Sequence, residues 1–179
     1  MGLSVTDYTA PTGYKSLRVL PHVPCNPMIW KGVWNTKSLP KVDYFIWTLS
    51  HNSFLTNDNL RKKGWEGPSR FPFCHSQEET ANHILISCCF TKEVWNLAIS
   101  PWTSSVDLPS DISSLISNCP SLCPFPILNK DHLKFSWLTL PKFIVWKLWL
   151  ERNNCIFRDK PSPTTRIVVK DKDLLGECL

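Results

Sequence analysis

Proline constrains the folding of this 179-residue chain more than any other residue type, because 15 prolines stand against only 6 glycines. Proline has no backbone N–H and holds φ near about −65°, so it interrupts helices and central strands. We therefore expect long uninterrupted helices to fall between prolines, leaving short helical pieces with irregular joints. The length suits one compact domain, or one domain with a loose appendage, and excludes two full enzymatic domains.

Apolar residues recur at helical spacing in several of the segments between prolines. Pro40 is placed to open one helix, and Thr56 is a natural N-cap for another. A helix is expected to kink at Pro141, with its strongest part after that proline. The predicted helices cover residues 40–52, 56–64, 78–87, 91–99, 111–117 and 142–153.

Composition divides the chain into five predicted parts. Residues 100–129 hold eight serines and five prolines, which is typical of a linker with at most one short helix. We expect an all-α fold: a small domain of short helices with a zinc-finger-like knuckle, a long polar linker and a C-terminal amphipathic helix. The parts are a loosely ordered segment 1–27, the domain 28–99, the linker 100–130, the Trp-rich helix 131–158 and a tail 159–179.

Charge and the N-terminal sequence limit the expected partners and location. Lys and Arg number 20 against 15 Asp and Glu, a net charge of +5, which permits a polyanionic partner without requiring one. The first residues show neither the basic nor the apolar region of a signal peptide, so we expect an intracellular, reducing setting. The apolar run 135–150 contains a proline and two lysines and is shorter than the ~20 residues of a membrane span, so no membrane segment is expected.

The segment FPFCHSQEETANHILISCCF carries the residues most able to do chemistry. Cys74, His83 and Cys88 bring two thiols and an imidazole around one short predicted helix. Zinc prefers four such ligands in a tetrahedron, and three are visible. Spacing alone leaves two interpretations open, a metal site and a pair of buried thiols.

A family resemblance extends this interpretation. From Trp30 to Asn96 the chain resembles the reverse transcriptase zinc-binding domain of plant LINE-type, non-LTR retrotransposon proteins, through WKGVWNTKSLPKVDYFIWTLSHNSFLTNDNLRKKG and CHSQEETANHILISCCFTKEVWN. A later block, WKLWLERNNCIFR, resembles the Trp-rich element that follows in the same proteins. In that family the domain lies between a reverse transcriptase and a ribonuclease H, and this chain is too short to hold either beside it. The resemblance thus implies a metal-binding module, not an enzyme, and no small-molecule substrate.

The family pattern C-x2-C-x7–8-H-x4-C implies four ligands. Cys74, His83 and Cys88 fall on its second, third and fourth positions. The first position is occupied by Phe71, which cannot bind a metal.

Three outcomes for the metal site are open. Zinc is held by three ligands and a water, or His75 or Cys89 serves as a substitute ligand, or the site is empty and Phe71 packs over two reduced thiols. We expect the empty site, because a structural zinc site draws much of its binding energy from complete coordination.

Other polar residues have plainer interpretations. Arg61, Lys62 and Lys63 could contact a phosphate backbone, although a solvated helix end explains them without a ligand. Glu78 and Glu79 are expected to favour the start of their own helix rather than to form a catalytic pair.

The sequence leaves two rival functions open. One is a metal-free protein-interaction module that presents the exposed face of the helix bearing Trp146 and Trp149. The other is a polyprotein remnant without function. Nucleic acid and protein both remain possible partners.

Overall fold

The computed structural model describes residue 34 and residues 38–100, 107–118 and 131–158. Within these ranges the fold is helical and has no strand, and its β-type pairing is one isolated bridge between Arg70 and Glu78. The all-α expectation is confirmed. The elements are α3 (Pro40–Ser50), α4 (Asn57–Lys62), the π-helix η2 (His83–Ser87), α5 (Cys89–Ile99), α6 (Ile112–Asn118) and α7 (Asp131–Arg158).

Helix α3 follows its sequence pattern closely. Pro40 occupies the first turn, where the missing N–H costs nothing. The apolar positions of the helix face inward, and Tyr44 lies on the outer face. The buried apolar residues of α3 are Val42, Phe45, Ile46 and Leu49.

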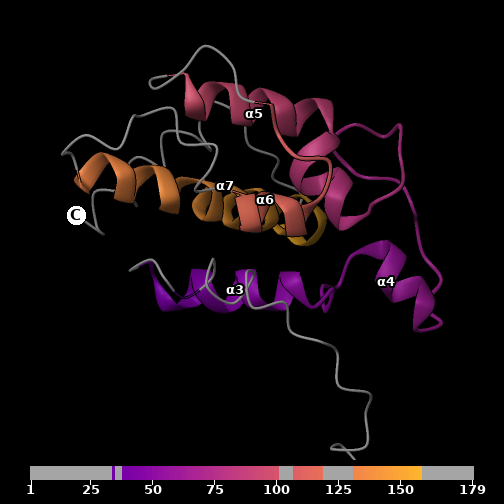
Figure 1. Cartoon of the computed structure of the whole chain (residues 1–179). Coiled ribbons are helices and arrows are strands. Elements are labelled where there is room, and N and C mark those ends of the chain that lie inside the picture. Colours follow the sequence, from indigo (N-terminus) through magenta and orange to yellow (C-terminus); the bar gives the residue numbers. More distant parts are fainter. Residues whose placement is uncertain (1–33, 35–37, 101–106, 119–130, 159–179) are drawn as a thin grey trace, which may run out of the picture.

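Helix α7 is the centre of the fold, with α3 on one side and α5 on the other (Figure 1). It runs through Pro141 without a break, so the expectation that long helices fall between prolines is wrong here. Proline inside a helix costs about 3 kcal/mol. Phe143, Ile144 and Leu148 are almost completely buried, and each contributes roughly 1.5–3 kcal/mol, which more than offsets that cost.

The two tryptophans of α7 that sequence placed on an exposed face are packed against α3. The ring of Trp146 meets Phe45 edge-on at 4.9 Å between centroids, and Trp149 lies 4.4 Å from Phe54. Both indoles are partly buried against the core. In the described parts of the chain, no helix combines the length and apolar character needed to cross a bilayer.

The helix expected over residues 78–87 begins later and winds differently. Helical backbone starts at Ala81 and becomes a π-helix from His83. Glu78 and Glu79 therefore precede the helix, and their side chains pair with residues of other segments. Glu78 pairs with Arg61 at the surface, whereas Glu79 is fully buried.

The short helix predicted within the linker is confirmed as α6. Asp111 caps it by accepting the Ser114 amide at 2.9 Å, and this bond is the main cause of a lowered pKa at Asp111. Ile112 and Leu115 are buried in the common core, so this part of the predicted linker packs against the domain. The predicted segments 1–27 and 159–179 lie outside the described residues.

Two buried ion pairs attach α7 to the rest of the protein. Lys142 Nζ lies 2.8 Å from Asp43 Oδ1 on α3. Arg152 donates through Nε to Glu79 Oε2 at 3.2 Å and through a second nitrogen to Glu79 Oε1. Glu79 Oε1 also accepts the backbone amide of Asn57 at 3.1 Å and so caps α4. Thr56 holds the N-cap position, as predicted, but its hydroxyl bonds Asp58 instead of the backbone.

The adjacent residues Glu78 and Glu79 provide a matched test of this arrangement. We expect Glu79→Gln to lower the free energy of unfolding by about 3–5 kcal/mol, because Arg152 would stay buried without a counter-charge. Glu78→Gln removes an exposed pair and should cost less than about 1 kcal/mol. Urea denaturation of both variants measures the difference, and equal losses would contradict the central role of Glu79.

Candidate metal centre

A tight backbone turn presents Cys74. The Phe71 amide donates to Gln77 O, and the His75 amide donates to Phe71 O, both at 2.9 Å. His75 closes the turn with a φ of 53°, in the left-handed region that few non-glycine residues adopt. The Cys74 sulfur accepts hydrogen bonds from the Ser76 hydroxyl and from the amides of Ser76 and Gln77. We call residues 71–77 the knuckle turn.

The π-helix explains how His83 and Cys88 come to face the same partner. An α-helix turns about 100° per residue, so residues five apart would point about 140° away from each other. Here the Cys88 amide donates to His83 O at 3.0 Å, which closes the wider i→i+5 turn. Both side chains therefore lie on the side of Cys74.

Two side chains of α5 stabilise this wide turn. The Thr91 hydroxyl donates to Ile84 O at 2.6 Å, and the indole N–H of Trp95 donates to Leu85 O at 2.9 Å. These carbonyls lie inside the core, where an unpaired acceptor would be costly. Trp95 is thus a buried structural residue, as its helical spacing indicates.

The three predicted ligands form one cluster. Their ligand atoms all lie within 4.8 Å of one another, and Cys74 Sγ is 3.2 Å from His83 Nε2. Tetrahedral zinc with Zn–S of about 2.3 Å and Zn–N of about 2.0 Å needs separations of roughly 3.5–3.8 Å, so small side-chain rotations would suffice. The Ser87 hydroxyl lies 3.4 Å from His83 Nδ1 and orients the ring with Nε2 toward the cluster.

The two thiols differ in protonation. Burial raises the pKa of Cys74, but hydrogen bonds from Ser76, His83 and the Gln77 amide outweigh it and lower the pKa to about 6. Burial raises the pKa of Cys88 to about 12, and the nearby Cys74 adds to that shift. At neutral pH the metal-free cluster therefore holds one thiolate and one thiol, and a metal ion would have to displace a proton from Cys88.

Phe71 occupies the first ligand position of the family pattern. Its side chain is only 1% exposed. The ring meets His83 edge-on, with 5.5 Å between centroids and an interplanar angle of 88°, and also packs against Phe73. The knuckle turn is therefore formed around an aromatic residue that offers no donor atom.

The suggested substitute ligands lie apart from the cluster. His75 and Cys89 are both exposed, and neither belongs to the group of ligand atoms that the described residues bring together. A Cys2His donor set remains, with zinc as the ion it fits best among the divalent metals.

The basic cluster sits on the surface of α4, separate from the cysteines. Arg61 pairs with Glu78 at 3.2 Å, and Lys62 pairs with Asp58 at 3.5 Å. Lys63 has no ion pair among the described residues. Most of this charge is thus balanced locally.

Sequence patterns did not predict the π-turn or the contact of Ser87 with His83. The H-x4-C spacing is the signal that could have shown the π-turn, because an α-helix does not bring residues five apart together. Ser87 carries no distinguishing pattern.

Alkylation of the zinc-free, reduced protein tests the two thiol pKa values. We expect iodoacetamide at pH 7 to modify Cys74 at least about tenfold faster than Cys88, because only the thiolate reacts. Since the pKa of Cys74 is lowered to about 6, its rate should fall about tenfold between pH 7 and pH 5. Peptide mass spectrometry measures both rates. In urea the two rates should converge, and equal rates in the folded protein would contradict the assignment.

Comparison with known proteins bears on the same region. Residues 8–95 match the family model described as zinc-binding in reverse transcriptase. The match contains the knuckle turn, η2 and all three clustered residues, and it ends before α6 and α7. No curated protein and no solved structure matches the chain.

Proposed function

Because this chain belongs to the reverse transcriptase zinc-binding family, we propose that it is a non-catalytic module derived from a plant LINE-type, non-LTR retroelement, with a degenerate metal site. Its metal ligands are Cys74, His83 and Cys88. Its role is to support nucleic-acid or interdomain contact. The module comprises residues 28–99, with the Trp-rich helix 131–158 packed on it.

One observation carries the proposal of a degenerate site. Three donor groups converge within 4.8 Å, while Phe71 in the first ligand position is buried against the ring of His83. The aromatic contact stabilises the same knuckle turn that a third thiolate, the missing fourth ligand, would link to the metal. The turn can therefore persist without zinc.

Bound zinc would act as a cross-link between the knuckle turn and the π-turn. Cys74 belongs to the knuckle turn, whereas His83 and Cys88 belong to the π-turn. The three ligands would therefore join two segments of backbone through the metal. A water would complete the tetrahedron. Affinity should be lower than with four protein ligands, because coordination supplies the binding energy of structural sites.

The rival protein-interaction module has less support. Its proposed contact face contains Trp146 and Trp149, and both pack against aromatic residues of α3 and the loop that follows it. This face is already used within the fold.

Zinc content tests the degenerate site. We expect reduced wild-type protein to bind zinc at least about tenfold more weakly than Phe71→Cys, because the variant regains the missing fourth ligand, a third thiolate. Cys74→Ser should lose binding in both backgrounds. Elemental analysis after dialysis against a graded chelator measures the affinity.

Phe71→Ala serves as the control for lost packing. Removal of a buried phenylalanine ring costs about 3–5 kcal/mol, so this variant should be destabilised and gain no zinc affinity. Wild-type protein that retains one zinc per chain as tightly as Phe71→Cys would contradict the degenerate site.

A further inference from the structure

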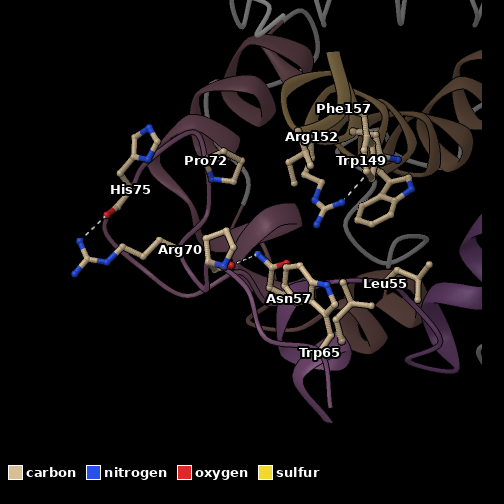
Figure 2. A pocket seen from close by; sticks show the side chains of 13 residues that line it. Leu55, Asn57, Trp65, Arg70, Pro72, His75, Trp149, Arg152 and Phe157 are labelled. Carbon is tan, nitrogen blue, oxygen red and sulfur yellow. Dashed lines mark hydrogen bonds between the residues drawn. The ribbon is translucent and has the colours of Figure 1, made fainter. Parts of the chain in front are cut away.

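A groove of about 610 Å³ lies between the 55–75 segment and the C-terminal end of α7 (Figure 2). None of the three clustered metal ligands lines it. Its rim carries exposed apolar side chains, with Trp65 43% and Phe157 75% exposed. Large apolar side chains gathered around a concave surface mark an interaction site.

Trp65 is held in place by a glycine. A Cβ atom on Gly67 would lie 1.8 Å from the indole ring of Trp65, so the ring rests directly on the backbone at this position. Trp65 also lines a neighbouring hollow of about 460 Å³ that reaches Arg61 and Gly64. The indole therefore stands between two concave surfaces and is available to both.

The opposite wall of the groove is rigid. Trp149 packs on Phe54, and the guanidinium of Arg152 lies 4.9 Å from the Trp149 ring centroid. Arg152 is fixed in turn by its ion pair with the buried Glu79. Phe157, on the last turn of α7, extends this wall outward (Figure 2).

The positive charge of the residues that line the groove favours an occupant that carries negative charge. Among the described residues that line it, two are arginines and none is Asp or Glu. Arg152 is neutralised by Glu79, whereas Arg70 donates only to the carbonyl of His75, at 3.3 Å, and has no carboxylate partner in the described parts of the chain. The exposed guanidinium of Arg70 points to the outer edge of the groove, toward the carbonyl of His75 (Figure 2), so an occupant that extends past this edge gains from carrying an anion there.

We propose that this groove binds single-stranded nucleic acid. Bases stack on Trp65 and Phe157, and Arg70 contacts a phosphate. Exposed aromatic rings beside a cation that has no carboxylate partner are the combination that recognises single strands. A duplex offers phosphates but keeps its base faces stacked inside. The inference rests on the nucleic-acid contact of the proposed function and assigns it to a site.

Fluorescence anisotropy with labelled single-stranded DNA and RNA 12-mers tests the groove in the full chain. We expect Trp65→Ala to weaken binding about tenfold through loss of base stacking. Arg70→Gln should weaken binding and reduce the slope of log affinity against log salt by about 0.7, the value for one phosphate on a single strand. A duplex of the same length should bind more weakly.

Matched controls lie on other faces of the fold. Tyr44→Ala removes an aromatic side chain that is 63% exposed on α3, and Lys92→Gln removes an exposed cation on α5. Both should leave affinity unchanged. Gly67→Ala keeps the indole but displaces it, so it should weaken binding as Trp65→Ala does. Because these positions are exposed, circular dichroism and the thermal midpoint should match the wild type.

The outcomes separate the groove from the broader function. If wild-type protein binds no oligonucleotide, both the groove and the nucleic-acid role are overturned. If Trp65→Ala and Arg70→Gln bind normally while Lys63→Gln does not, only the groove is overturned. Zinc content of Trp65→Ala should equal that of the wild type, so the metal site is assessed independently. An apolar dye that occupies the groove while oligonucleotides do not would indicate a protein-docking face and overturn the proposal.

Discussion

The buried carboxylate of Glu79 sets the positions of three separate parts of the protein. Its side chain caps α4 through the Asn57 amide and forms the ion pair with Arg152 of α7. The backbone amide of Glu79 donates to Ser69 O at 2.8 Å, and this bond fixes the segment that leads into the knuckle turn. A buried charge is tolerated only when it is fully paired, so these partners are mutually dependent. Glu79 thus anchors both the segment that leads to Cys74 of the metal cluster and the part of α7 that carries Arg152 in the wall of the groove.

The parts of the fold that follow local rules were predicted from sequence. Helix α3 has clear apolar spacing and a proline at its start, α6 has a modest amphipathic pattern, and both occur where the pattern places them. The errors arise where tertiary contacts prevail. Pro141 does not end α7, because burial on both sides of the helix outweighs a missing hydrogen bond. Glu79 does not support its own helix, because Asn57 and Arg152 bind it from distant positions.

The candidate site shows the same division. The three donor residues and the anomalous Phe71 are visible in the sequence, since they follow from residue type and spacing. The thiol pKa values could not be predicted from the sequence, because they depend on burial and on amide hydrogen bonds of the folded knuckle turn. The groove was not predicted either, because its two walls come from the 55–75 segment and the end of α7, which are far apart in the sequence. No local pattern reports that Trp65 and Phe157 share a surface.

The winding of η2 bears on how relatives of this chain should be aligned. Residues four apart lie on one face of an ordinary α-helix, so a chain one residue shorter between His83 and Cys88 could build the same cluster with a regular helix. The π-turn accommodates the additional residue without moving either donor. A gap in an alignment at this point therefore signifies a change of helix type and not the loss of a ligand. An inserted residue in this segment leaves the three donor groups together if the α-helical turn becomes a π-helical turn at the same time.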